Sequence, residues 1–486
     1  MKPKLPAFFL FFLATVLTAQ ATQTKPVGPN ELMAWLAAGI SNSRLTEIAQ
    51  QRGLTNSCSR EQAGQFEAAG AAAALLRAIS TSKSVSGNAA VSPFPPLLLK
   101  AASEAKSHRF HEAELYLRSV VEADPQNSAY HYALGNMLMR QELWDDAFDE
   151  ITLAAKFLPD LPENHNSFAY IFYRLDDGPN AIAEARTALS MDPQNAEAYQ
   201  FLGLALYSNG QYAAAAHALD ESLARDAGNP DTYYDLGITL HAAGDQAAAI
   251  TAYRQAIRSK PSFWEAHSNL GLIWHEENRL DDAIAEYREA QRLAPEQASV
   301  RNNLGNTYCD KADFDSAINE LQALYREHPE WQQGHGCLAR AYMAKKEYGA
   351  AIGEFKQAVL QNPISASEHR MLGQALVLND QLEDGVHELR LAVTLNPDSE
   401  EAHHFLGTAL FQQQQTAAAE KEFREALRLN SSAENHYSLA ACLMTLDRYD
   451  EALAELDAAA RLAPERTLYR ARREELMKLI NETNSR

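Results

Sequence analysis

The chain has 486 residues, with 43 Lys and Arg against 64 Asp and Glu, and a formal net charge of −21. This excess of negative charge repels nucleic acid and anionic membrane surfaces at long range, so neither is an expected partner. The four cysteines are too few and too scattered to predict a disulfide framework, even in an oxidising compartment.

Residues 1–21 have the pattern of a cleavable signal peptide. Lys2 and Lys4 precede the apolar run AFFLFFLATVL, and the small residues Ala19 and Ala21 form the cleavage motif. The run has about a dozen residues, whereas a membrane-spanning helix needs roughly 20. We therefore expect export to a periplasm or extracellular space, with an uncleaved anchor as the alternative, and no integral membrane span in the mature chain.

Residues 22–79 predict a small helical module that is out of phase with the rest of the chain. Its four short helical stretches have Asn30, Ser43 and Ser59 as candidate N-caps, and Gly53 and Gly70 as candidate stops. Residues 80–93 are rich in Ser and predict a flexible linker. The sequence does not indicate what the module does.

Three series of residues then repeat along the chain with one phase, which is the signature of a repeat protein. Nine of the ten intervals in the first series are 34 residues and the last is 33. The first series consists of Ala101, Gly135, Ala169, Gly203, Gly237, Gly271, Gly305, Ala339, Gly373, Gly407 and Ala440. The second consists of Ala113, Ala147, Ala181, Ala215, Ala249, Ala283, Ala317, Ala351, Gly385, Ala419 and Ala452. The third consists of Pro125, Pro159, Pro193, Pro261, Pro295, Pro329, Pro363, Pro397 and Pro464.

Each series has a physical explanation. Apolar residues at helical spacing lie on both sides of a polar break such as EENRLDD, so each unit is predicted to be two helices joined by a tight turn. Gly and Ala let two helix backbones approach each other closely. Proline disfavours helix at the residue before it and so ends the second helix of each unit.

The pattern resembles that of the tetratricopeptide repeat family. One unit matches it at Leu270, Gly271, Trp274, Ala283, Tyr287 and Pro295. The resemblance covers residues 94–464 and implies an all-α fold, in which about eleven helix-turn-helix repeats form a right-handed superhelix. The first helix of each repeat is expected to line a concave groove, and residues 465–486 to form a capping helix with a polar outer face.

The sequence contains no recognisable catalytic motif. It has no glycine-rich phosphate loop, no nucleophile elbow and no His-Glu-x-x-His helix, so no catalytic residue, cofactor or metal is expected. The adjacent pair His403 and His404 points to different helix faces and is not expected to bind a metal. Cys309 and Cys337 are offset by about six residues along neighbouring parallel helices, or ~9 Å, so no disulfide is expected between them.

The resemblance also indicates which side chains face the groove, namely those three before and one, four or five after each small residue. We expect a protein or peptide partner there, and Tyr132, Arg140, Tyr170 and Arg174 are the favoured cluster, suited to an acidic or C-terminal carboxylate segment. The full set of candidates is Tyr132, Asn136, Arg140, Asn166, Tyr170, Arg174, Tyr207, Tyr234, Asn302, Asn306, Arg340 and Arg370.

Two functions remain open from the sequence. The first is a secreted or periplasmic scaffold without catalytic activity. The second is the targeting or substrate-recognition portion of a glycosyltransferase-type enzyme system, because Asn269 and Asn303 resemble the asparagine ladder of that class. The scaffold is favoured because the chain ends at Arg486, five residues past the helical stretch 466–481 of the predicted cap, so no catalytic domain is expected. The sequence identifies neither the partner nor the oligomeric state.

If the signal is cleaved after Ala21, the native protein should begin at Thr22. Intact-mass measurement and N-terminal sequencing of protein from its native compartment test this. A chain that keeps Met1 and sediments with membranes would contradict the prediction.

Overall fold

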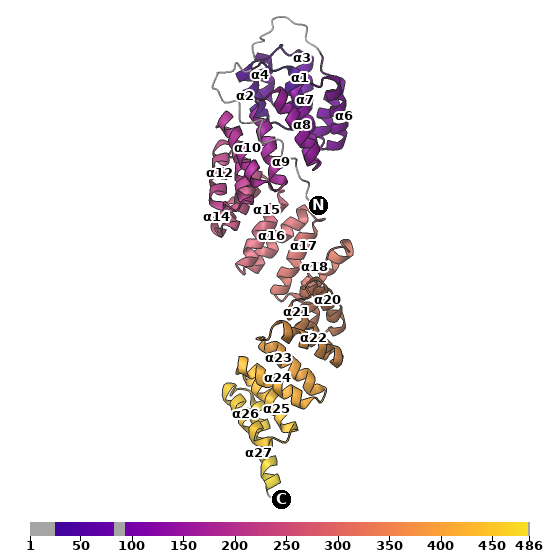
Figure 1. Cartoon of the computed structure of the whole chain (residues 1–486), viewed down its shortest axis with the longest axis vertical. Coiled ribbons are helices and arrows are strands. Elements are labelled where there is room, and N and C mark those ends of the chain that lie inside the picture. The colour runs from indigo at the N-terminus through magenta and orange to yellow at the C-terminus, as the bar shows by residue number, and fades with distance from the viewer. Residues whose placement is uncertain (1–24, 82–92, 485–486) are drawn as a thin grey trace. The chain divides into compact units, whose positions relative to one another are not determined.

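The computed structural model describes residues 25–81 and 93–484, and within these ranges the chain is helical almost throughout (Figure 1). The predicted signal peptide 1–21 and most of the predicted linker 80–93 lie outside the described residues. Contacts between helices divide the chain into two compact units, one that extends to Ser259 and one that begins at Lys260.

The predicted N-terminal module is present as four helices in the first unit. They are α1 (Pro29–Ala38), α2 (Asn42–Arg52), α3 (Arg60–Ala69) and α4 (Ala73–Thr81). The cap at Ser59 and the stops at Gly53 and Gly70 are confirmed. The caps predicted at Asn30 and Ser43 are wrong. Helix α1 starts at Pro29, one residue before Asn30, because proline has a φ suited to the first helical position. Helix α2 is capped by Ser41 and not by Ser43, since the Ser41 side chain accepts a hydrogen bond from the Arg44 N–H.

Five helix pairs follow the module in the first unit. Their first helices are α5 (Pro96–Lys106), α7 (Ser128–Arg140), α9 (Pro162–Arg174), α11 (Ala196–Ser208) and α13 (Pro230–Ala242). Their second helices are α6 (Phe110–Ala123), α8 (Trp144–Phe157), α10 (Gly178–Met191), α12 (Tyr212–Arg225) and α14 (Gln246–Ser259).

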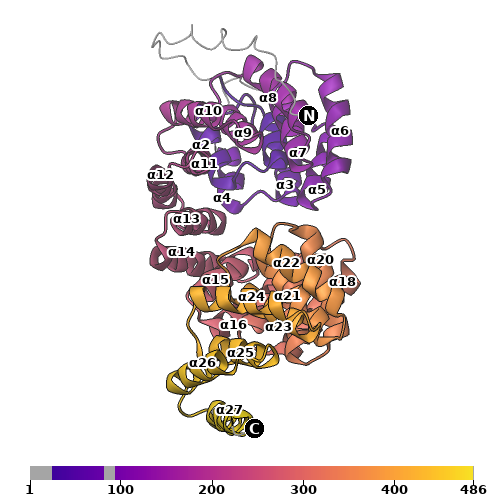
Figure 2. The same cartoon turned by 60° about the horizontal axis from the view of Figure 1, so that its bottom comes forward.

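Six helix pairs and a final helix form the second unit, in which α20, α21 and α22 lie side by side (Figure 2). The first helices are α15 (Trp264–Glu276), α17 (Ala298–Asp310), α19 (His335–Ala344), α21 (Ala366–Leu378), α23 (Glu400–Gln412) and α25 (Ala433–Thr445). The second helices are α16 (Leu280–Leu293), α18 (Phe314–Glu327), α20 (Tyr348–Gln361), α22 (Leu382–Leu395), α24 (Thr416–Leu429) and α26 (Tyr449–Leu462). Helix α27 (Thr467–Asn484) packs on α26 where the capping helix was predicted.

The small residues lie where the two helices of a pair come closest, as predicted. A Cβ atom on Gly237 would lie 2.5 Å from the Tyr253 ring, and one on Gly305 would lie 2.7 Å from Leu321. Gly385 is the one glycine in the alanine series, and its close approach to Gly373 explains why alanine is absent there. A Cβ on Gly373 would lie 3.0 Å from the Gly385 carbonyl oxygen, and a Cβ on Gly385 would lie 3.1 Å from the Gly373 carbonyl oxygen, so both positions exclude a side chain.

Every turn between paired helices contains one residue in the left-handed backbone region, with φ between 56° and 84°. These residues form a fourth series with the same period, although only two of them are glycine. The sequence does not reveal this series, because the turn imposes the conformation on many residue types. The residues are His108, Glu142, Asp176, Gly210, Gly244, Asn278, Ala312, Lys346, Asp380, Gln414 and Asp447.

A histidine–glutamate pair joins the two helices in seven of the repeats. In each, the histidine Nδ1 lies 2.5–2.7 Å from a carboxylate oxygen of the glutamate nineteen residues later, as in His403 with Glu422. The hydrogen bond to Glu150 and to the Pro125 carbonyl raises the pKa of His131 despite its burial. These contacts fix His335 and His403 within the repeat, which explains the two histidine clusters seen in the sequence.

Alanine substitutions at two glycines of the second unit distinguish the effect of close packing from the effect of glycine's backbone flexibility. Gly373→Ala should destabilise the protein by ~1–3 kcal/mol, because the new methyl group meets backbone atoms that cannot turn away. Gly353→Ala, on an exposed helical position with no atom within 4 Å of its Cβ, should stabilise it by about 0.5–1 kcal/mol. Urea midpoints of the two variants measure the difference. Equal midpoints would contradict the role of close approach at Gly373.

Candidate functional site

The N-terminal module covers the start of the groove in the first unit. Helix α1 packs against α5 and α7, and α3 lies beside α5 (Figure 2). Tyr132 of α7 is only 4% exposed, and Asn166 of α9 is only 1% exposed. Both residues were predicted to line an open groove, and the structure places them in the core. Helix α1 packs on α7, which carries Tyr132, whereas Asn166 donates a hydrogen bond to Glu197 of the next repeat.

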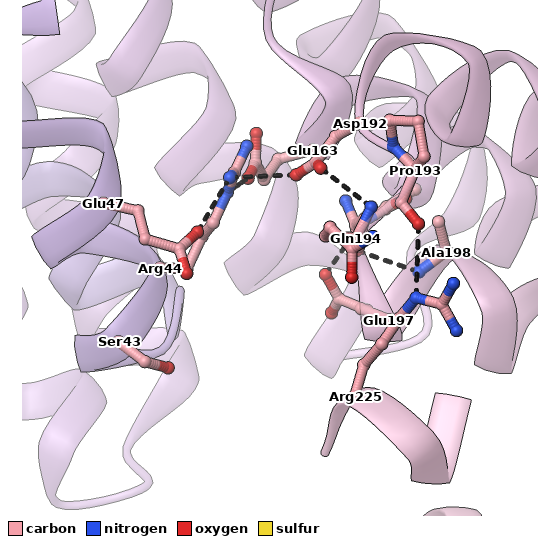
Figure 3. A network of polar contacts seen from close by, with 12 residues as sticks. Ser43, Arg44, Glu47, Glu163, Asp192, Pro193, Gln194, Glu197, Ala198 and Arg225 are labelled. Atoms are coloured by element: carbon pink, nitrogen blue, oxygen red, sulfur yellow. Dashed lines mark hydrogen bonds and ion pairs between the residues drawn. The ribbon is translucent and has the colours of Figure 1, made fainter. Parts of the chain in front are cut away.

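A polar network holds the module in place (Figure 3). Arg44 of α2 forms ion pairs with Glu163, which is 2% exposed, and with Asp192 at 2.9 Å. Arg52 donates a hydrogen bond of 2.8 Å to the Asp160 carbonyl oxygen. These contacts reach the third repeat, so the module is fixed along three repeats rather than attached only at its end.

The remaining members of the favoured cluster are engaged within the protein. Arg174 donates to Glu142 at 3.0 Å and to the Tyr170 hydroxyl at 3.1 Å, and it stacks on the Trp144 ring at 4.6 Å. Arg140 is exposed and near Gly39 at the end of α1, since a Cβ there would lie 3.7 Å from its guanidinium. Tyr132, Arg140, Tyr170 and Arg174 therefore do not form one open receptor.

Three other candidates of the first unit lie on three separate first helices, α7, α11 and α13. Asn136 donates to the Tyr132 carbonyl oxygen of its own helix at 3.0 Å. Tyr207 and Tyr234 are half-buried, with rings 5.6 Å and 5.9 Å from neighbouring tyrosine rings of the second helices. Asp235 was not predicted. Burial raises its pKa to about 7, although it accepts a hydrogen bond from Gln200 at 2.8 Å.

The second unit brings together three of the predicted candidates around a cavity of about 440 Å³ between α17, α19 and α21, here called the Gly336 pocket. Phe355, Met371 and Cys337 supply apolar surface, and Asn306, Arg340 and Arg370 supply polar groups. Asn302, a fourth candidate, is buried beside the pocket, since a Cβ on the lining residue Gly334 would lie 2.7 Å from its side-chain oxygen. The complete lining is Asn306, Gly334, Gly336, Cys337, Arg340, Phe355, Ser367, Glu368, Arg370 and Met371.

The pocket exists because one repeat departs from the others. Gly336 occupies the position three before the small residue, where the neighbouring repeats carry Asn302 and Arg370. Helix α19 also has ten residues, whereas α17 and α21 have thirteen. Gly334 has a φ of +95°, a conformation that favours glycine, and it ends the loop before α19. The missing side chain and the missing helical turn leave the space that forms the pocket.

Glu368 is the unexpected member of the pocket. Within the described residues its side chain accepts no hydrogen bond, and its Oε2 atom is buried. A Cβ on Gly336 would lie 3.0 Å from Oε1, so this oxygen borders the space above the glycine. Burial raises the pKa of Glu368, although the positive charges of Arg340 and Arg370 oppose the shift. The sequence offered no signal for it, because a glutamate on a charged helix is ordinary.

Both arginines of the pocket keep hydrogen-bonding capacity. Among the described residues, the ion pair of Arg340 is with Asp310 at 3.4 Å, and that of Arg370 is with Glu401 at 3.4 Å. A guanidinium has five N–H donors, so each group can bind a further acceptor. The pocket thus presents two cationic donors together with a carboxylate that lacks a donor.

A disulfide joins Cys309 and Cys337 at the wall of the pocket, contrary to the prediction. Their Cα atoms lie 6.1 Å apart, within the range of ordinary disulfides. The prediction assumed that α19 has the same extent within its repeat as α17. Helix α19 ends in phase, since Ala344 lies 34 residues after Asp310, but it begins after a seven-residue loop, 328–334, whereas the loop before α17, 294–297, has four residues. Because α19 lacks its first turn, the repeat spacing alone does not give the distance between the two cysteines.

Across residues 25–81 and 93–484, no three side chains of the metal-binding types converge on one point. None of the helices in these ranges is long and apolar enough to cross a membrane.

The profile of the family described as Tetratricopeptide repeat matches the chain at residues 98–162, 167–230, 234–298, 302–369 and 338–400. A second profile, described as Anaphase-promoting complex, cyclosome, subunit 3, matches residues 379–459. The first covers more than half of the chain, including the whole Gly336 pocket.

Several solved structures are similar to the chain. The crystal structure of the anaphase-promoting complex hetero-tetramer Cut9-Hcn1 is 17% identical, with 76% of this chain and 73% of that one covered and a TM-score of 0.45. Yeast Tom70 is 14% identical, with 79% and 95% covered and a TM-score of 0.32. The protein MamA is 25% identical, with 34% and 97% covered and a TM-score of 0.30.

The disulfide predicts how many thiols react. In denaturant without reductant, a thiol reagent should label two residues, Cys58 and Cys442, and after reduction it should label four. In the native protein both free thiols should react slowly at neutral pH, because burial raises the pKa of each to about 11. Four reactive thiols before reduction would contradict the disulfide.

Proposed function

Because the chain belongs to the tetratricopeptide repeat family, we propose that it is an exported, non-catalytic scaffold that binds a partner protein at the Gly336 pocket. The pocket itself carries the proposal. It is lined by Asn306, Arg340 and Arg370, three groove positions implied by the family pattern, and it combines an apolar floor with convergent polar groups.

The partner segment that fits this pocket is acidic. Guanidinium groups bind carboxylates through two parallel hydrogen bonds, and Arg340 and Arg370 each have donors left for such a contact. The net charge of −21 does not prevent binding at short range, because physiological salt screens exposed charges beyond about 8 Å. The excess of negative charge elsewhere on the protein favours this pair of arginines over other surfaces for an acidic ligand.

Export is supported by two independent features. Residues 1–21 have the charge, apolar run and small-residue motif of a signal peptide. The Cys309–Cys337 disulfide is of a kind that forms and persists in oxidising compartments outside the cytosol. The proposed setting is therefore a periplasm or extracellular space.

Filling the pocket should abolish binding of the partner. Gly336→Gln places a long side chain in the space above Glu368, and the amount of partner recovered with the mature protein from its native compartment should fall about tenfold or more. Gly349→Gln is the matched control, because it adds the same side chain to the next helix of the same repeat, where nothing lies within 4 Å of the Cβ.

Quantitative mass spectrometry of the captured proteins measures the effect, and circular dichroism checks that both variants fold. Recovery of the same proteins in the same amounts with wild type, Gly336→Gln and Gly349→Gln would exclude the pocket as the binding site.

A further inference from the structure

We propose that the Gly336 pocket holds one tyrosine side chain of the bound acidic segment, with the phenol hydroxyl donating a hydrogen bond to the Glu368 carboxylate. The inference rests on the proposed function and specifies which residue of the partner the pocket binds. It follows from three properties of the pocket: its apolar floor, its carboxylate without a donor, and the two arginines at its rim.

The floor suits an aromatic ring. Phe355 is fully buried beneath the pocket, and Met371 and the Cys309–Cys337 disulfide add polarisable sulfur at its sides. Sulfur atoms make favourable contacts with aromatic ring edges. A cavity of about 440 Å³ can hold one large side chain together with part of its backbone.

Glu368 requires a donor from the ligand. Its carboxylate accepts no hydrogen bond from the described residues, and an acceptor that stays unpaired when the ligand excludes water is unfavourable. A phenol hydroxyl provides the donor at the end of an apolar ring, which is the combination that a deep, mixed pocket selects. Phenylalanine would fill the same space but leave Glu368 unpaired.

The arginines exclude a cationic donor. A lysine ammonium that approached Glu368 would also approach the guanidinium groups of Arg340 and Arg370, both of which interact electrostatically with that carboxylate. A neutral hydroxyl avoids this repulsion. The same two arginines bind carboxylates on either side of the tyrosine, so the recognised segment is a tyrosine flanked by acidic residues.

The test uses capped synthetic peptides of sequence Glu-Asp-Glu-X-Glu-Asp-Glu, in which X is Tyr, Phe or Lys, titrated into the mature protein. The Tyr peptide should bind about tenfold more tightly than the Phe peptide, because only it forms the charge-assisted hydrogen bond. The Lys peptide should bind more weakly than the Phe peptide.

Variants of Glu368 test whether this residue causes the preference for the Tyr peptide over the Phe peptide. In Glu368→Leu the ratio between the Tyr and Phe affinities should fall to about one, and in Glu368→Gln, which keeps one acceptor oxygen, it should be intermediate. Glu401→Gln, which removes only the exposed partner of Arg370, should leave the ratio unchanged. The ratio of two peptides on one variant does not depend on how stable that variant is, so folding is controlled internally.

Equal affinities for the Tyr and Phe peptides, or a tenfold preference that survives Glu368→Leu, would overturn the tyrosine inference. If Gly336→Gln then still abolished capture of the partner, the proposed function would stand. Failure of all three peptides to bind would also overturn the inference, and the capture experiment would decide the proposed function separately.

Discussion

The close approach of two helix backbones within each repeat is the contact on which the rest of the structure depends. A methyl group on Gly237 would lie 2.5 Å from the Tyr253 ring, so the first helix of each pair rests directly on its partner. Because each repeat makes this contact at the same position, successive first helices present the same positions to one face. A single packing constraint thus sets the period of the chain and the orientation of its groove.

The features that distinguish the chain lie where one repeat departs from this pattern. At α19 a glycine replaces a groove-facing side chain, the helix is three residues shorter than its neighbours, and a disulfide ties it to α17. In a uniform array such a gap would be filled by the residue at position 336. Here the gap is bordered by Phe355 and Glu368. The disulfide restrains the shortened helix and so helps to keep the pocket open.

The N-terminal module has the opposite effect in the first unit. Helix α1 packs on α5 and α7, and Arg44 and Arg52 form polar contacts with the second and third repeats. The module gives these first helices the apolar cover that a preceding repeat would otherwise provide. It also packs on α7, which carries the buried Tyr132. In the second unit, by contrast, the candidates Arg340 and Arg370 border the Gly336 pocket.

The sequence by itself determined the repeat, its period and its helix pairs, because each depends on local spacing that recurs eleven times. It also determined that Asn306, Arg340 and Arg370 face one side, since position within the repeat fixes the face. Tertiary structure alone decided that the module covers the first repeats, that Cys309 and Cys337 meet, and that Glu368, which lacks a donor, lines one pocket with two arginines. The physical reason is that these contacts join residues whose distance depends on how α1 folds back and where α19 begins, and neither is set by a pattern that repeats along the chain.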